Sequence, residues 1–160
     1  MKTTNNMLLR SFSSLFVIVL LAGCTMGFGK SLVLCSPFQG RLVDGQGQPA
    51  AGIKIERHWV WGWNDKEGSD DTVTDDAGYF QLPLVEGSSF LGSMMPHEPD
   101  VRQRIIAYGP NGEVEIWYAS KKSYELNSEL DGRPVKVVCR IDKEPSDEGL
   151  YWGTCSEDTR

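Results

Sequence analysis

Three tryptophans are spaced so that they share one face of a β-strand. Trp59, Trp61 and Trp63 alternate with other residues in RHWVWGWND, and alternate side chains of a strand point to the same side of a sheet. Such indoles either pack into a core or form a platform that binds a protein or a sugar, which makes them the candidate binding residues. Because the stripe continues the face begun by Ile55, we expect Trp59 and Trp61 to be structural and Trp63, beside a polar turn, to be the most exposed. Arg57 on the same face indicates a bulge or the end of the core before Trp59.

The other groups that could do chemistry do not form a catalytic pattern. His58 and His97 are the only histidines, and the Gly-x-Ser-x-Gly, phosphate-loop and His-Glu-x-x-His motifs do not occur. Calcium takes about six to eight oxygens in register, and the spacing of a calcium loop is missing. We therefore expect a solvated hairpin tip where carboxylates follow the tryptophans, at Asp65, Glu67, Asp70, Asp71, Asp75 and Asp76. The sequence predicts no enzyme, no metal and no cofactor.

The N-terminus has the layout of a secretory signal. Lys2 and Arg10 precede a continuously apolar run over residues 15–22, far short of the roughly 20 residues that a membrane-spanning helix needs. The run ends in Leu21-Ala22-Gly23-Cys24, which resembles the lipobox of bacterial lipoproteins. That resemblance implies cleavage before Cys24 and acyl chains on its sulfur and amino group, enough for stable anchoring. Thr25, where an Asp would favour inner-membrane retention, favours the outer membrane, facing the periplasm.

Length and charge limit the number of domains and the kinds of partner that the chain can have. The net charge of −6 becomes −8 when residues 1–23 are removed, because these hold Lys2 and Arg10 and no acid. No basic cluster occurs in the remaining 137 residues, which excludes nucleic acid as a partner. After the signal peptide at 1–23, we expect a short tether at 24–31 and a single domain at 32–160. The expected partners are the membrane, through the N-terminal lipid, and an envelope protein.

Three cysteines follow Cys24, and an oxidising periplasm favours one disulfide among them. They allow three pairings, which sequence alone does not separate. We expect Cys35–Cys139, because both residues lie in or beside predicted strands. Cys139–Cys155, which closes a shorter loop, is the close alternative. No Cys-x-x-Cys pair occurs, so a zinc or redox site is not expected.

Short runs rich in β-branched and aromatic residues alternate with turn residues along the chain, which predicts strands. The runs are 38–44, 53–63, 72–74, 79–84, 102–108, 113–119 and 133–141. Asn111-Gly112 marks a hairpin, after which Val114, Ile116 and Tyr118 are expected to share one face. A short helix is expected only at 120–132. The spacing of the runs predicts an all-β fold, an antiparallel β-sandwich.

Four segments of the first half follow a known pattern. They are Gly40-Arg41-Leu42, Gly47-Gln48-Pro49-Ala50-Ala51-Gly52, Ile53-Lys54-Ile55 and Thr74-Asp75-Asp76-Ala77-Gly78-Tyr79-Phe80. Over residues 38–85 the chain thus resembles the carboxypeptidase-regulatory-like, transthyretin-like (prealbumin-like) domains, which implies a transthyretin-like sandwich. It is also similar to small proteobacterial lipoproteins with this domain and no assigned function. Transthyretin-like hydrolases use histidines and a terminal Tyr-Arg-Gly-Ser, whereas this chain ends in YWGTCSEDTR, so hydrolase activity is not implied.

These features together predict a non-enzymatic, lipid-anchored periplasmic protein that binds another protein at the cell envelope. Two alternatives stay open. One is an immunity protein that neutralises a toxin delivered to the periplasm, which fits the small size, the acidity and the lack of catalytic groups. The other is a glycan- or peptide-binding module that uses Trp59, Trp61 and Trp63. A toxin gene beside this one would favour the first, and a polysaccharide locus the second.

Overall fold

A computed structural model describes residues 31–89, 99–148 and 151–158 of the chain. The regular elements are strands, joined by turns that include short 3-10 segments at Gly62–Asn64 and Ser128–Leu130. The strands are β1 (Ser31–Cys35), β2 (Phe38–Val43), β3 (Lys54–Trp61), β4 (Lys66–Val73), β5 (Tyr79–Leu82), β6 (Val85–Ser88), β7 (Val101–Gly109), β8 (Gly112–Ser120), β9 (Val135–Arg140), β10 (Trp152–Gly153) and β11 (Cys155–Glu157). Within the described ranges, no helix is long and apolar enough to cross a membrane.

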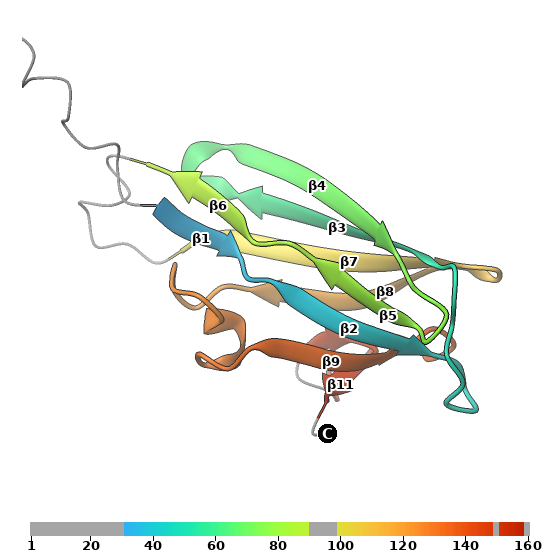
Figure 1. The fold of residues 1–160 in the computed structure, drawn as a ribbon. Coiled ribbons are helices and arrows are strands. Elements are labelled where there is room, and N and C mark those ends of the chain that lie inside the picture. The colour runs from blue at the N-terminus through green and yellow to red at the C-terminus, as the bar shows by residue number, and fades with distance from the viewer. Residues whose placement is uncertain (1–30, 90–98, 149–150, 159–160) are drawn as a thin grey trace, which may run out of the picture.

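The strands form two packed layers, so the predicted all-β sandwich is confirmed (Figure 1). One sheet has the order β10-β8-β7-β3-β4, and the other has the order β11-β9-β2-β5. A separate pair, β1-β6, continues the lines of β2 and β5 beyond the second sheet (Figure 1). Pairing is antiparallel except between β2 and β9, which are parallel, a departure from the purely antiparallel arrangement that the sequence predicts.

Two glycines of the pattern in the first half have local reasons. Gly78 has φ +77°, a conformation that L side chains rarely adopt, and ends the turn into β5. Gly40 lies under the ring of Phe80, and a Cβ there would come within 2.2 Å of the ring. The first glycine therefore shapes a turn, and the second leaves room for the end of the Phe80 ring against β2.

The acidic run after the tryptophans lies partly in an edge strand. The prediction of a hairpin tip was therefore wrong for Glu67, Asp70 and Asp71, whereas Asp65, Asp75 and Asp76 do lie in turns. β4 pairs with β3 along its whole length, and the turn between them is only the short 3-10 segment, closed by Asp65 at φ 49°. An edge strand with one face in water accommodates carboxylates on alternate residues and is protected by them from pairing with other chains. The segment expected as a helix at 120–132 likewise forms only the 3-10 turn at Ser128–Leu130.

The β7–β8 hairpin is confirmed, with Gly109 paired to Gly112 across the turn. The expected face of β8 was partly wrong, because the register shifts opposite Ile105 and Ile106. A bulge of this kind places two successive residues on one side of the strand. Ile116 and Trp117 are accordingly both buried, and Tyr118 lies on the outer face with 39% of its surface exposed.

The interior has two hydrophobic clusters of unequal size. The main core fills the space between the two large sheets and includes Phe38, Leu42, Ile55, Ile105, Trp117 and Val137. The minor cluster lies beneath the β1–β6 pair and consists of Leu32, Leu34, Trp61 and Val101. On β3 and on β7 the residue between the two clusters is polar and buried, so the apolar interior is interrupted.

Polar side chains fill this interruption and form what we call the buried charged layer: Ser36, Arg57, Asp70, Gln103, Lys121 and Glu129. Glu129 accepts hydrogen bonds from Lys121 Nζ at 3.0 Å, from Ser36 Oγ at 2.6 Å and from Gln103 Nε2 at 3.2 Å. Burial raises the pKa of the Glu129 carboxyl, but the hydrogen bonds from Ser36 and the charge of Lys121 outweigh burial and hold the pKa below its ordinary value.

Arg57 belongs to this layer. The expectation of a bulge before Trp59 was wrong, whereas the alternative, that the main core ends before Trp59, agrees with the two clusters. β3 pairs without interruption on both sides, and the Arg57 side chain is fully buried. Its Nε donates to Asp70 Oδ1 at 2.8 Å, and its Nη groups donate to the carbonyl oxygens of Ser36 and Pro83. A charged residue on a core-facing position is thus accommodated by partners rather than by a break in the strand.

Candidate functional site

The three tryptophans do not form one platform. Trp61 has no exposed surface, and its Nε1 donates to the Tyr124 hydroxyl at 3.0 Å. Trp59 is partly buried, and its ring lies so close to Gly68 of β4 that a Cβ there would meet it at 2.5 Å. Trp63, in the turn, is 37% exposed. Trp63 is therefore the most exposed of the three, as predicted, but burial does not fade steadily along the strand, because Trp61 is more buried than Trp59. A binding surface made of all three is excluded because Trp61 is inaccessible.

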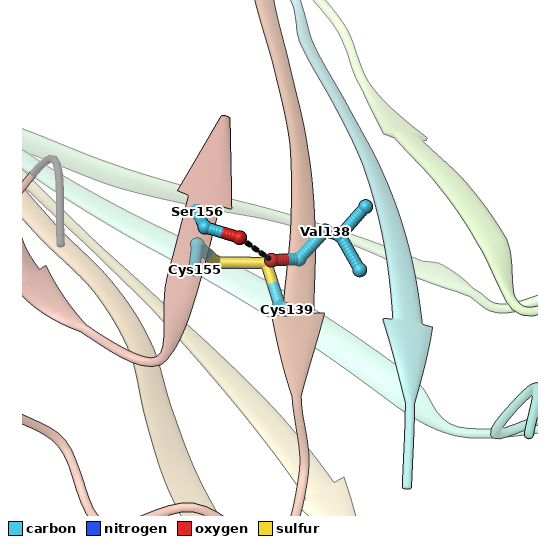
Figure 2. Close-up of a disulfide and its surroundings, with 4 residues drawn as sticks. All are labelled: Val138, Cys139, Cys155 and Ser156. Carbon is cyan, nitrogen blue, oxygen red and sulfur yellow. Dashed lines mark hydrogen bonds between the residues drawn. A yellow bond between two sulfur atoms is a disulfide. The ribbon is translucent and has the colours of Figure 1, made fainter. Parts of the chain in front are cut away.

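The disulfide joins Cys139 to Cys155, so the first choice of Cys35–Cys139 was wrong and the alternative is the pair found. The two residues are directly opposite each other on β9 and β11, with Cα atoms 3.9 Å apart (Figure 2). Beside the bond, the Ser156 hydroxyl donates to the Val138 carbonyl at 3.5 Å (Figure 2). Cys35 is a buried free thiol, and burial raises its pKa to about 12. Cys24 lies outside the described residues.

The remaining predicted groups are dispersed. His58 is half-buried on the outer face of the five-stranded sheet, with Nε2 at 3.4 Å from Glu56 Oε1, whereas His97 lies outside the described residues. Asp75 stabilises the turn before β5, since its Oδ1 accepts from the backbone N–H groups of Ala77 and Tyr79. Among the residues that the structure describes, no group of three His, Cys, Asp or Glu side chains is placed to hold a metal ion.

An aromatic and basic surface does occur, on the outer face of the five-stranded sheet. We call it the aromatic–arginine face, and it consists of His58, Val60, Arg102, Arg104, Tyr118 and Trp152. The strand register places Trp152 opposite Tyr118, Tyr118 opposite Arg104, and Arg104 opposite His58. These four side chains thus form one row across four neighbouring strands. Trp152 is 48% exposed and Val60 is 38% exposed, so the apolar residues of this face are open to a partner.

Ion pairs with the surroundings hold the arginines. Arg104 Nε lies 2.8 Å from Glu115 Oε2, and Arg102 Nε lies 3.5 Å from Asp100, yet about half of each arginine side chain is exposed. Two shallow depressions of about 160 and 440 Å³ adjoin at Arg104 and Tyr118. The arrangement offers planar aromatic and guanidinium groups on a rigid sheet, which suits recognition of another surface rather than covalent chemistry.

A second polar group lies at the far end of the same face. Hydrogen bonds from Lys54 and Tyr108 hold the pKa of the Glu56 carboxyl below its ordinary value. The Lys54 ammonium lies 5.4 Å from the centre of the Tyr108 ring, within the range of a cation–π contact. These groups satisfy one another, and this end of the face is therefore less available than the row around Tyr118.

Sequence reasoning missed the aromatic–arginine face. The alternation of Arg102 and Arg104 with buried residues in β7 was a signal that could have placed both arginines outward. Tyr118 was assigned to the wrong side because the bulge in β8 has no clear mark in the sequence. Trp152 lies in a strand of two residues, too short for a periodic pattern.

Comparison with known proteins gives a family but no activity. A crystal structure of a 9R-lipoxygenase from Cyanothece PCC8801 is similar over 71% of this chain, with 13% identity and a TM-score of 0.34. The chain spans only 17% of that protein, and the likeness is too slight to indicate a shared fold or activity. No curated protein matches the chain. The model of the family described as "Domain of unknown function (DUF6795)" matches residues 38–144, which is more than half of the chain, and the protein therefore belongs to the DUF6795 family.

Proposed function

We propose that this protein is a non-enzymatic binding module of the cell envelope that docks another protein on its aromatic–arginine face. The observation that carries the proposal is the row formed by Trp152, Tyr118 and Arg104, which are exposed on a sheet whose other large aromatic residues in β3 and β8 are buried or partly buried. Trp, Tyr and Arg are the residue types that most often dominate binding energy at protein interfaces. A sheet also holds them in place before binding, which lowers the entropic cost of association.

The proposed place of the protein is the outer membrane, facing the periplasm. Support comes from Leu21-Ala22-Gly23-Cys24 at the end of the apolar run. β1 begins at Ser31, seven residues after Cys24, so a lipid on Cys24 would hold the domain within about 25 Å of the bilayer at full extension.

Docking is tested by placing a photo-crosslinking amino acid at Tyr118 in cells that make the lipidated protein. The matched control carries it at Tyr79, which is also an exposed tyrosine on a strand but lies on the other sheet. We expect one discrete adduct from Tyr118 and none of that size from Tyr79. The partner in the adduct, once purified, should bind Arg104→Ala and Trp152→Ala at least about tenfold more weakly than wild type. Equal adducts from both positions, or unchanged affinity in both variants, would refute the proposed face.

Anchoring is tested separately by cell fractionation of Cys24→Ala, with Cys35→Ala as the matched control. We expect the first variant to leave the membrane fraction and the second to remain in it, because Cys35 is buried in the domain. If Cys24→Ala stays in the membrane fraction as fully as wild type, the lipid anchor is wrong, whatever the outcome at Tyr118.

A further inference from the structure

An open groove of about 600 Å³ lies on the outer face of the second sheet and is bounded on one side by Thr72 and Val73, at the end of the edge strand β4. Its floor is built from alternate residues of three neighbouring strands. One row is Lys136, Gln39 and Gln81, which the register places side by side on β9, β2 and β5. The next row includes Arg41 and Tyr79, which are opposite each other on β2 and β5. The groove is therefore a two-row polar surface on a rigid sheet, and it is separate from the aromatic–arginine face.

Three of the floor residues have polar groups that are not used within the fold. Gln39, Gln81 and Lys136 are exposed, and among the described residues none of them has a side-chain hydrogen bond or ion pair. Each glutamine amide offers both a donor and an acceptor, and the lysine offers donors. The groove thus presents several hydrogen-bonding groups of both kinds to whatever enters it.

The second row is held in place instead. Arg41 Nε donates to the Ala77 carbonyl at 3.2 Å, and its guanidinium carbon lies 5.7 Å from the centre of the Tyr79 ring. Tyr79 is nevertheless 52% exposed. The pair therefore gives the groove a preorganised donor beside an apolar ring, and a ligand would not have to order these side chains on binding.

The charges that line the groove balance. Arg41 and Lys136 are basic, and Asp75 and Asp158 are acidic. A site for a phosphate or sulfate group would have an excess of positive charge, and a site for an acyl chain would have a mainly apolar lining. Neither description fits this lining. A ligand with many hydroxyl groups, no net charge and an apolar C–H face uses all of these groups at once.

We propose that this groove binds a neutral carbohydrate. The glutamine amides and the Arg41 guanidinium exchange hydrogen bonds with the sugar hydroxyls, and the ring of Tyr79 packs against the C–H face of one sugar. The volume lies in the usual range for small-ligand sites and indicates a short oligosaccharide segment. This inference does not depend on protein docking at the aromatic–arginine face, which lies on the other sheet.

The test is a titration of the full mature protein, held in a detergent without a sugar headgroup and followed by NMR. The probes are chitotetraose, cellotetraose and maltotetraose. We expect at least one of them to give saturable shifts of the Gln39 and Gln81 amides below about 10 mM. Gln39→Ala and Tyr79→Ala should each weaken that binding at least about tenfold. Tyr118→Ala is the matched control and should leave it unchanged.

Salt dependence sharpens the test, because the groove has no net charge. Raising the salt concentration from about 50 to about 500 mM should change the dissociation constant by less than about twofold. Tyr79 and Gln39 are exposed, so their variants should fold like wild type, which the same spectra verify. The proposal is overturned if none of the three tetrasaccharides gives saturable shifts, if Tyr118→Ala weakens binding as much as Tyr79→Ala, or if salt abolishes binding.

Discussion

The main core and the minor cluster are held together in different ways. The main core is closed by both large sheets and by the disulfide between β9 and β11. The minor cluster is covered by the β1–β6 pair, whose register is irregular between Val33 and Cys35. Between the two clusters lies the buried charged layer, not continuous apolar packing. The comparison shows that one end of this sandwich depends on hydrophobic contact, whereas the join to the other end depends on ion pairs and hydrogen bonds between buried side chains.

The order of residues along the strands supports this division. β3 passes from Ile55 through Arg57 to Trp61, and β7 passes in the opposite direction from Val101 through Gln103 to Ile105. The polar residue occupies the middle position in both. A change in the layer should therefore affect both clusters, whereas a change in either cluster should remain more local.

The largest effect is expected from Lys121→Met, which leaves Glu129 buried without its cation. Removing one partner of a buried ion pair costs about 3–5 kcal/mol of the free energy of unfolding. Lys122→Met is a matched control in the neighbouring residue, because the Lys122–Asp131 pair is exposed on both sides, and exposed ion pairs contribute little to stability. Urea unfolding of both variants measures the difference. Similar urea midpoints for the two variants would show that the buried Lys121–Glu129 pair contributes no more to stability than the exposed pair does.

A slightly smaller effect is expected from Trp61→Ala in the minor cluster. Truncation of a buried Trp costs about 3–5 kcal/mol, and we expect about 3, because β1 and β6 cover the site from one side only and can close on part of the space. Trp63→Ala, two residues away, should cost less than about 1 kcal/mol. If the urea midpoint shows Trp63→Ala to be less stable than Trp61→Ala, the finding that Trp61 is buried and Trp63 is exposed would be contradicted.

Loss of the disulfide should have the next largest effect on stability, and it should act on the main core. The bond spans 16 residues, a loop for which chain-entropy models give about 3 kcal/mol, and real proteins often show somewhat less. We expect Cys139→Ala/Cys155→Ala to lower the free energy of unfolding by about 2–3 kcal/mol. Cys35→Ala removes only a buried thiol and should cost about 1 kcal/mol.

The free thiol of Cys35 provides an independent test of the Cys139–Cys155 disulfide. Burial raises the pKa of Cys35 to about 12, so a thiol-alkylating reagent should leave the native protein unmodified near neutral pH. In denaturant, the reagent should label one cysteine of the domain, and peptide mapping should place the label on Cys35. A label on Cys155 would mean that the disulfide has formed with a different partner.

The smallest effect is expected from pH, and it distinguishes the layer from the clusters. The pKa of Glu129 is lowered in the folded protein, so its carboxylate stabilises the fold at pH values above its unfolded pKa, and this contribution is lost as pH falls through the folded pKa. The unfolding free energy of wild type should therefore fall more steeply in acid than that of Glu129→Gln. Asp131→Asn serves as the exposed control. If the unfolding free energy of Glu129→Gln falls in acid as steeply as that of wild type, another carboxylate sets the acid sensitivity.

The parts of the fold that the sequence predicts are those with regular alternation. β2, β3, β7, β8 and β9 lie where the apolar runs indicate strands. Arg57 marked the break in the apolar interior but also suggested a bulge that is absent. The sequence could not show that the strand stays regular there, because Asp70 and Ser36 become its neighbours only through the fold. The pairing of Cys139 with Cys155 was kept only as the alternative, because β11 has only three residues and no strand pattern marks it in the sequence. The candidate site was missed because a bulge and a two-residue strand place two of its aromatic residues.

The parallel pairing of β2 with β9 has a consequence for when the protein folds. Phe38 of β2 is paired with Val135 of β9, roughly 100 residues later in the chain. The second sheet therefore cannot assemble until almost the entire polypeptide is present, and contacts of such long range form slowly. For an exported chain, as we propose this one to be, late assembly keeps the polypeptide unfolded while its N-terminus is threaded across a membrane, and leaves sheet formation to the compartment in which Cys139 and Cys155 can be oxidised.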